Sequence, residues 1–267
     1  MAESPLSTPR HMNNKVVAFP RTRAPRTWLV SANGAGDFGS ISEAIREAVA
    51  GDTIQVGPGI YIESLYVDKA VHLVGPVDPR FVEEDFDADE EPYAMIMGLG
   101  GESIRWAADG GSIQNLFITR VTSGDDSDLT SALIRMRSGK IRIERCVMAD
   151  GAHCAVASRG GDVEMIRCHV RNVPVGVCML DTNVVMERNH VEGAEVLSLH
   201  VENGATASLK DNSFEGRTVL RGDIRLFQGN DIDTLFVHTA LVTNGNRISS
   251  LVHVCDFRAE KPFAVGL

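Results

Sequence analysis

The second half of the chain repeats a short pattern of polar and apolar positions. A Cys or an Asn is followed by one variable residue and then by Met, Val, Phe or Ile. We call the Cys and Asn positions the ladder residues; they recur at steps of 22, 21, 23, 18 and 16 residues and comprise Cys146, Cys168, Asn189, Asn212, Asn230 and Asn246. Self-similarity at this period is typical of a solenoid, in which each repeat forms one coil and stacks on the next.

Apolar residues alternate with other residues in the segment before each ladder residue. An alternation of period two predicts a strand whose apolar side chains point inward and stack on those of the next coil. Ile224 and Leu226 lie one residue out of register with this pattern. The pairs that follow it are Ile141 and Ile143, Val163 and Met165, Val184 and Met186, and Ala207 and Leu209.

The ladder residues themselves are predicted to occupy the bend between two strands. Asn tolerates the left-handed backbone conformation that such a bend requires. Stacked Asn side chains can also hydrogen-bond from one coil to the next. We therefore expect the ladder to stabilise the solenoid along its axis.

The first part of the chain predicts one helix between short strands. Trp28-Leu29-Val30 begins a strand, and residues 40–50 form a helix with Ser40 as N-cap and Glu43 at the capping-box position. Gly51-Asp52 ends this helix, and short β-rich segments separated by Gly and Pro follow. The apolar face of the helix has the spacing i, i+3, i+4, i+7, i+8 and contains Ile41, Ala44, Ile45, Ala48 and Val49.

The opening of the chain is similar to a known group of solenoids. The residues that carry the resemblance are Gly34-Ala35-Gly36-Asp37-Phe38, Ile41 to Ile45, Gly51 to Ile54, and Gly59-Ile60-Tyr61-Ile62-Glu63. Together with the repeats, they resemble right-handed parallel β-helix proteins of the pectin-lyase-like superfamily. The opening looks like that of pectin methylesterases and of related carbohydrate-binding and sugar-hydrolase modules. The resemblance implies an all-β, single-stranded right-handed parallel β-helix with an N-terminal capping α-helix.

Charge and pattern divide the chain into three parts. Residues 1–27 form a basic arm rich in Pro and Arg, which is expected to be flexible. Residues 28–251 form the β-helix, with the capping helix at about 40–50 and an acidic loop at about 78–92. Residues 252–267 are expected to form a C-terminal cap or tail.

The composition excludes several function classes. A net charge of −10 speaks against nucleic-acid binding, which requires a basic surface. The sequence has no run of about 18 apolar residues, so no membrane span is predicted. The N-terminus lacks the apolar stretch of a secretory signal, and the five cysteines form no CxxC. These features predict reduced thiols and a cytoplasmic protein, with association with the cytoskeleton or mitochondrial targeting left open.

The motifs of the resembling esterases are missing. A pectin methylesterase should carry two glutamine-bearing oxyanion motifs and an Asp-Phe-Ile-Phe-Gly motif with the nucleophilic Asp, and none is present. The nearest acids are Asp150 and Asp181, which we interpret as turn residues rather than catalytic ones. A uronate lyase would need a carboxylate cluster for calcium and a basic residue to remove a proton. No catalytic residue is therefore assigned.

Three arginines immediately precede ladder residues in successive coils. Arg145, Arg167 and Arg188 should form a column along one outer edge. Such a column could bind the carboxylates of an acidic polysaccharide or of an acidic protein segment, because guanidinium groups match carboxylates in two-bond geometry. The alternative is that these arginines pair with Glu144, Glu164 and Glu187 on a solvated face.

Two histidines follow ladder residues in adjacent coils. His169 and His190 should lie about one strand spacing apart, where they could bind a metal or relay a proton. The sequence names no third ligand at a fixed spacing. We therefore interpret the two histidines as polar side chains that stack on each other, and we assign neither a metal nor a cofactor.

Two functions remain open. The first is a non-catalytic intracellular scaffold that binds other proteins through its arm and its solenoid faces, as in F-box and SHC-binding-type β-helix proteins of cytoskeletal or ubiquitin-linked complexes. The missing esterase motifs and the missing export signal favour this hypothesis. The alternative is a polysaccharide-binding or polysaccharide-active protein, and any enzyme would be a carbohydrate esterase or polysaccharide lyase. In that case the arginine column would hold the ligand.

Overall fold

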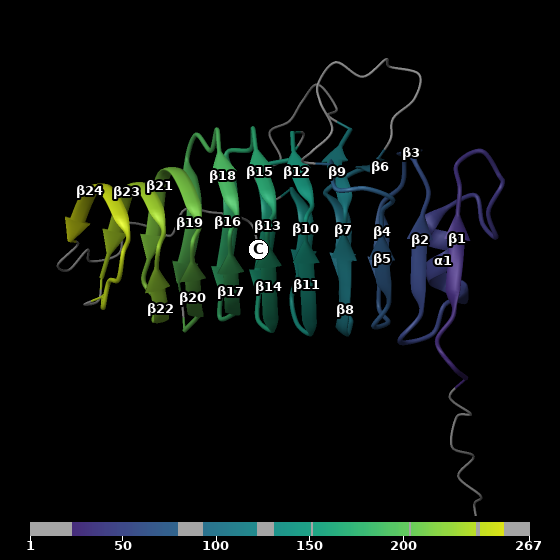
Figure 1. Ribbon diagram of the computed structural model, residues 1–267, viewed down its shortest axis with the longest axis horizontal. Helices are drawn as coiled ribbons and strands as arrows, with labels where there is room; N and C mark the ends of the chain where they lie inside the picture. Colours follow the sequence, from purple (N-terminus) through teal and green to yellow (C-terminus); the bar gives the residue numbers. More distant parts are fainter. Residues whose placement is uncertain are drawn as a thin grey trace, which may run out of the picture.

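The computed structural model shows a right-handed parallel β-helix, and it describes residues 23–79, 93–121, 131–150, 152–202, 204–238 and 241–253. The strands stack along one long axis, with the single described helix at the N-terminal end (Figure 1). One coil of the middle part consists of β10 (Ala132–Met136), β11 (Lys140–Glu144) and β12 (Val147–Ala149). The predicted fold class is therefore confirmed.

The strands form two parallel sheets. The first sheet has nine strands in the order β1 (Thr27–Val30), β2 (Thr53–Val56), β5 (His72–Val74), β8 (Asp109–Gln114), β11, β14 (Asp162–Ile166), β17 (Asn183–Glu187), β20 (Thr206–Lys210) and β22 (Asp223–Gln228). Every one of these strands pairs in parallel with its neighbours.

The second sheet wraps around the other two sides of each coil. One side contains β3 (Gly59–Tyr61), β6 (Ala94–Gly98), β9 (Leu116–Arg120), β12, β15 (His169–Arg171) and β18 (His190–Glu192). The long strand β21 (Ser213–Leu220) pairs with β18 through its first residues and with β19 through its last ones, so it joins the two sides. The other side contains β4 (Leu65–Val67), β7 (Glu102–Trp106), β10, β13 (Cys154–Arg159), β16 (Val175–Leu180) and β19 (Leu197–Glu202).

The inward columns are those that the alternation predicts. Ile141, Val163, Val184 and Ala207 are direct cross-strand partners, and so are Ile143, Met165, Met186 and Leu209. All eight are buried. The irregular coil contains a register shift in β22, which places Phe227 rather than Leu226 opposite Leu209. Leu226 is accordingly exposed and Phe227 is buried.

The ladder residues form a continuous hydrogen-bonded column inside the solenoid. The Asn189 side-chain oxygen accepts the Cys168 N–H at 2.9 Å, and the Asn212 oxygen accepts the Asn189 N–H at 3.0 Å. Asn230 and Asn246 continue the same pattern. Each Asn amide also donates to the carbonyl of a strand residue in a preceding coil, such as Met165 or Met186. The column therefore satisfies polar backbone groups that the bend would otherwise bury without partners.

The left-handed bend lies one residue earlier than predicted. The residue that precedes each ladder residue has a positive φ: Arg145 (53°), Arg167 (52°), Arg188 (55°), Asp211 (54°), Gly229 (66°) and Gly245 (65°). The ladder residues instead turn their side chains inward, because there the Asn amide can reach the backbone of two neighbouring coils. The prediction that Asn itself adopts the left-handed conformation is wrong.

The helix α1 (Ile41–Glu47) begins as predicted and ends earlier. The Ser40 hydroxyl accepts the Glu43 N–H at 3.2 Å, which makes Ser40 the N-cap. The chain leaves the helix at Ala48, whose ψ is 156°, and the buried Asp52 carboxylate accepts the next N–H, that of Val49, at 3.0 Å. Val49 is consequently 40% exposed, so it does not belong to the buried helix face.

Glu63, the last residue of the Gly59-Ile60-Tyr61-Ile62-Glu63 motif, holds the start of α1. Its carboxylate accepts the backbone N–H groups of Ile41 at 2.8 Å and Ser42 at 2.9 Å. A carboxylate at a helix N-terminus satisfies donors that have no partner within the helix. With seven residues, α1 is too short to cross a bilayer, and the described residues contain no membrane-spanning helix.

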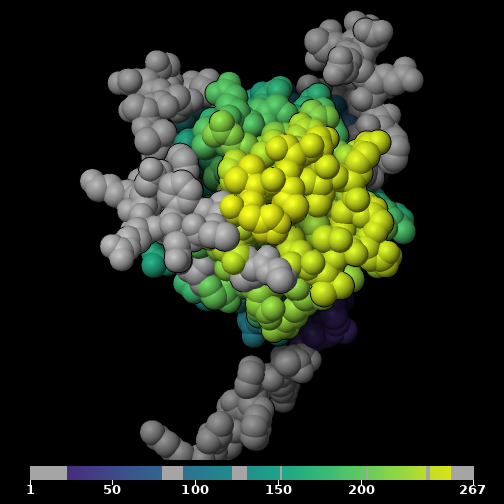
Figure 2. All heavy atoms as spheres, turned by 90° about the vertical axis from the view of Figure 1, so that its left-hand side faces the viewer, coloured from purple at the N-terminus to yellow at the C-terminus, as the bar shows by residue number. Residues whose placement is uncertain are grey.

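At the C-terminal end, β23 (Asp231–Val237) and β24 (Arg247–His253) form the outermost described coils (Figure 2). The predicted boundaries at 27/28 and 251/252 remain predictions. Most of the predicted arm (1–22), most of the acidic loop (80–92) and most of the C-terminal segment (254–267) lie outside the described residues.

Candidate functional site

A column of arginines follows the corner between the first sheet and β12, β15 and β18. Arg145, Arg167 and Arg188 occupy the left-handed bend of three successive coils. Their backbone N–H groups donate to carbonyls of the next coil at 3.0, 2.9 and 3.0 Å, so the corners are stacked in register. Arg167 and Arg188 are exposed and Arg145 is half-buried.

The charges of these arginines are only weakly compensated. Arg145 lies 3.7 Å from Glu144, and Arg188 lies 3.7 Å from Glu187. The expected pair of Arg167 with Glu164 does not form, because Glu164 contacts Arg142 at 2.8 Å on the same sheet face. Within the described part of the chain, no acidic group lies within ion-pair distance of Arg167.

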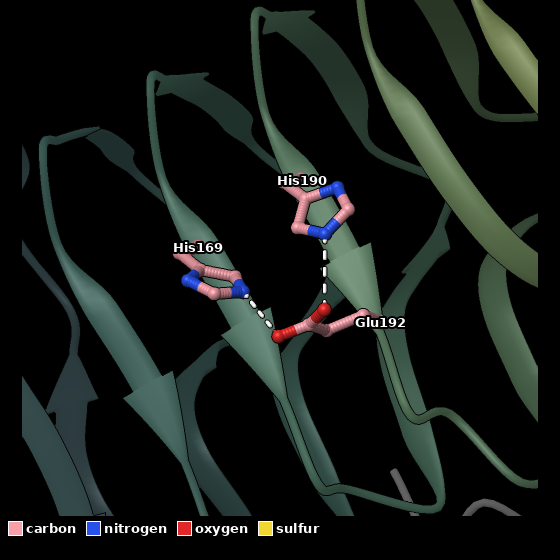
Figure 3. A group of neighbouring side chains, drawn as sticks. All are labelled: His169, His190 and Glu192. Carbon is pink, nitrogen blue, oxygen red and sulfur yellow. Dashed lines mark hydrogen bonds and ion pairs between the residues drawn. The ribbon is translucent and has the colours of Figure 1, made fainter. Parts of the chain in front are cut away.

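Two histidines, each two residues after a corner arginine, contact the same carboxylate. His169 of β15 and His190 of β18 are direct cross-strand partners, with ring centroids 5.1 Å apart. Glu192, two residues after His190, points to the same side and places its carboxylate between the rings (Figure 3). Its Oε1 lies 2.8 Å from His169 Nε2 and its Oε2 lies 3.2 Å from His190 Nε2. We call Arg145, Arg167, Arg188, His169, His190 and Glu192 the Arg–His face.

The electrostatics of this cluster favour a neutral imidazole and an ionised carboxylate. Partial burial, together with the nearby His190 and Arg171, lowers the pKa of His169, although the Glu192 carboxylate acts to raise it. Partial burial also acts to raise the pKa of Glu192, but hydrogen bonds from His190 and His169 outweigh that effect, and the net shift is downward. At neutral pH the His169 imidazole can therefore act as an acceptor or a ligand, while Glu192 carries a negative charge.

The neighbouring strands limit how far this face extends. On the N-terminal side, His169 pairs with Val147, which is only 3% exposed. On the other side, His190 pairs with Ser213 of β21, and the Glu215 carboxylate lies 3.8 Å from His190 Nε2. Arg171 lies directly across from Glu192. The accessible part of the face is therefore centred on β15 and β18.

The weak catalytic alternatives lie elsewhere. Asp150 and Asp181 are exposed and adopt positive φ of 56° and 49°, as turn residues do. Neither belongs to the Arg–His face. Their placement gives no support to a nucleophilic role.

A second cluster combines residue types that are used in nucleophilic catalysis. Cys178 Sγ lies 3.8 Å from His200 Nδ1, and His200 Nε2 lies 2.6 Å from Glu202. However, burial raises the pKa of Cys178 to about 12, so the thiol is protonated at neutral pH. Cys178 and His200 are 1% and 6% exposed, so substrate cannot reach them in this conformation. None of the four described cysteines forms a disulfide, and all four are buried.

Glu192 belongs to the histidine cluster and was not predicted from the sequence. The signal was available, because residues i and i+2 of a strand lie on the same face, and His190 and Glu192 have this spacing. What the sequence did not show is that the Glu192 side chain reaches the imidazole of the preceding coil as well as that of its own.

Sequence comparisons identify no relative. No family model matches the chain, and no curated protein matches it.

Solved structures share the fold. A pectin methylesterase from Aspergillus niger matches with a TM-score of 0.50 at 11% identity, over 88% of this chain and 93% of that one. A pectin methylesterase from Erwinia chrysanthemi matches at 0.47 and 13%, over 85% and 81% of the two chains. An alginate lyase of the PL6 family matches at 0.45 and 12%, over 89% and 41%. At 11% identity, the likeness to the Aspergillus niger structure shows the shared fold alone.

The comparisons overturn the scaffold hypothesis. The Aspergillus niger pectin methylesterase shares the fold over most of both chains, and nothing in the comparisons supports a non-catalytic intracellular scaffold. The missing esterase motifs speak against one reaction on this fold and give no evidence for a scaffold.

Proposed function

We propose that this right-handed parallel β-helix binds an acidic polysaccharide on its Arg–His face. The observation that carries the proposal is the stacking of Arg145, Arg167 and Arg188 in register at one corner of the solenoid. Parallel strands are about 4.8 Å apart, so three such corners place arginine Cα atoms at regular steps along the axis. A polymer with a carboxylate on successive sugar units can meet these arginines one after another.

The outer face of the first sheet offers a contrast. There, Arg142 contacts Glu164 at 2.8 Å and Glu144 at 3.0 Å, while Lys140 contacts Asp162 at 3.4 Å. Those cations already have close acidic partners on neighbouring strands. The corner arginines have acidic partners at 3.7 Å or none within the described residues. A ligand carboxylate would therefore not have to break a close ion pair in order to bind them. The corner arginines therefore differ from the cations of the first sheet, whose charges are already paired.

The chemistry of guanidinium and imidazole groups fits such a ligand. A guanidinium can donate two parallel hydrogen bonds to one carboxylate. His169 and His190 lie beside the corner and can hydrogen-bond to sugar hydroxyls. The whole chain carries a charge of −10, so a polyanion will be attracted only by a local cationic surface, and binding should weaken as salt screens it.

The shared fold also supports the proposal. The Aspergillus niger protein that matches most of this chain is named for its action on pectin. Pectin is a polysaccharide whose units bear free or esterified carboxyl groups. A ligand of that class would place carboxylates against the corner arginines.

Replacing the three corner arginines by Asn is expected to weaken the binding of an oligogalacturonate by about 100-fold. Each exposed ion pair contributes up to about 1 kcal/mol, so three lost contacts correspond to roughly 3 kcal/mol. Asn is preferred to Ala because it tolerates the left-handed backbone at these positions. Isothermal titration calorimetry of R145N/R167N/R188N against the unmodified chain measures the effect.

The matched control removes three exposed arginines elsewhere. Arg46, Arg105 and Arg225 have side chains that are 70%, 60% and 64% exposed. The variant R46N/R105N/R225N has the same net charge as the corner variant and should bind nearly as well as the unmodified chain. An equal loss in both variants, or no binding by the unmodified chain at millimolar ligand, would contradict the proposal.

A further inference from the structure

We infer that His169, His190 and Glu192 form a binding site for a divalent transition-metal ion of the zinc class. The site goes beyond the proposed polysaccharide function and does not depend on it. Two imidazole nitrogens and one carboxylate oxygen supply three ligands, and all three side chains are partly exposed, which leaves room for a fourth ligand.

The three donor atoms already converge. Both Nε2 atoms point at the Glu192 carboxylate, at 2.8 Å from His169 and 3.2 Å from His190 (Figure 3). One donor atom from each of the three residues lies within 4.8 Å of the others. In a tetrahedral zinc site with ligand distances near 2.0 Å, the donor atoms are roughly 3.3 Å apart. Small rotations of the side chains are therefore enough to admit an ion between them.

The backbone beneath the site is fixed. His169 N–H donates to the Cys146 carbonyl, and His190 N–H donates to the Cys168 carbonyl, both at 2.9 Å. The two imidazoles thus stand on adjacent hydrogen-bonded strands, and Glu192 follows on the same strand as His190. Metal binding needs no rearrangement of the backbone, which keeps the cost of organising the site low.

The donor set selects the kind of metal. Calcium and magnesium prefer six or more oxygen ligands, whereas two imidazoles with one carboxylate suit zinc and its neighbours. A further carboxylate, that of Glu215, lies 3.8 Å from His190 Nε2 and can complete the set. Two carboxylates with two neutral imidazoles would balance the charge of a divalent ion.

Two other features set the expected affinity. The side chains are accessible, with 24% exposure for His169, 38% for His190 and 36% for Glu192, so an ion can enter from solvent. Arg171 lies across from Glu192 and opposes a cation. We therefore expect affinity in the micromolar range rather than that of a buried structural zinc site.

The test is a titration of the full chain with zinc alone, after treatment with a chelator and without polysaccharide. Calorimetry should show one ion bound per chain with micromolar affinity. The variants H190Q and E192Q should each weaken binding by at least about tenfold, since each removes one of three ligands. H253Q, which replaces an exposed histidine of β24, should bind zinc as the unmodified chain does.

The absorption spectrum of bound cobalt provides a second measurement, which reports the coordination geometry of the ion. Binding of Co²⁺ in place of zinc should give visible absorption bands of a four-coordinate ion, and these bands should be lost in H169Q. Circular dichroism of each variant checks that the solenoid is still folded. No binding at millimolar zinc, or binding unchanged in H190Q and E192Q, would overturn the inference. Because no sugar is present, this result stands apart from the test of polysaccharide binding.

Discussion

Replacing Asp52 by Ala should lower the free energy of unfolding by roughly 3–5 kcal/mol, because a buried carboxylate that accepts several hydrogen bonds is removed. The Asp52 side chain is completely buried and accepts the backbone N–H groups of Arg26 at 2.8 Å and Val49 at 3.0 Å. It also accepts the Trp28 indole N–H at 2.9 Å and pairs with Arg23. The substitution leaves these donors without a partner at the point where α1 meets the first strands.

The pKa of Asp52 agrees with this role. Burial acts to raise it, but hydrogen bonds from Arg23, Val49, Arg26 and Trp28 outweigh burial and hold it well below its usual range. The stability that the carboxylate contributes is therefore fully present above the unfolded-state pKa near 3.9, and it is lost only as the pH falls below that value. Measurements at neutral pH report the full effect.

Urea denaturation followed by circular dichroism measures the change, with Asp37→Ala as the control. Asp37 is exposed and accepts one backbone N–H, that of Leu29 at 2.9 Å. Its removal should cost no more than about 1 kcal/mol. If the Asp52→Ala variant loses no more stability than the Asp37→Ala variant, the buried network does not hold the N-terminal cap.

Replacing Asn212 by Ala should lower the free energy of unfolding by roughly 2–4 kcal/mol. The Asn212 side chain is 1% exposed, accepts the Asn189 N–H at 3.0 Å and donates to the Met186 carbonyl at 2.9 Å. Each buried group left without a partner costs about 1–3 kcal/mol, and the substitution leaves at least two. The effect falls on two coils at once, because the ladder joins them.

Asn183 is the matched control for the ladder. It is exposed on β17, donates to Asp162 at 2.8 Å and accepts from Thr206 at 2.7 Å. Its replacement by Ala should cost less than about 1 kcal/mol, because water can take the place of both partners. A loss for Asn212→Ala within about 0.5 kcal/mol of that for Asn183→Ala would show that the column is not a structural element.

Much of the architecture could be predicted because the solenoid turns sequence period into spatial register. Ile143 and Met165 have the same place in neighbouring repeats, and they become cross-strand partners. The ladder residues are recognisable for the same reason. The Ser40 cap follows from a local rule that needs no tertiary contact.

The remaining features depend on contacts between coils that no single repeat contains. Arg167, and not Cys168, adopts the left-handed conformation. The ladder side chains point inward, where the Asn189 oxygen can accept the backbone N–H of Cys168 in the preceding coil. The register shift in β22 can be recognised only when the pairing of β22 with β20 is known. Glu192 contacts His169 only because β18 pairs with β15, which places the Glu192 side chain beside the imidazole of the preceding coil. Function was harder still, since the absence of esterase motifs says nothing about binding.

The most direct test of the central claim asks where an acidic polysaccharide lies on the solenoid. Imidazole resonances provide reporters on separate faces: His169 and His190 lie on the Arg–His face, His72 on the first sheet and His200 on the side opposite β15 and β18 in the coil. A chelator-treated sample is titrated with oligogalacturonate and followed by NMR. We predict saturable shifts for His169 and His190 with His72 and His200 unchanged. Saturable shifts confined to His72 or His200, or none at all, would contradict the account.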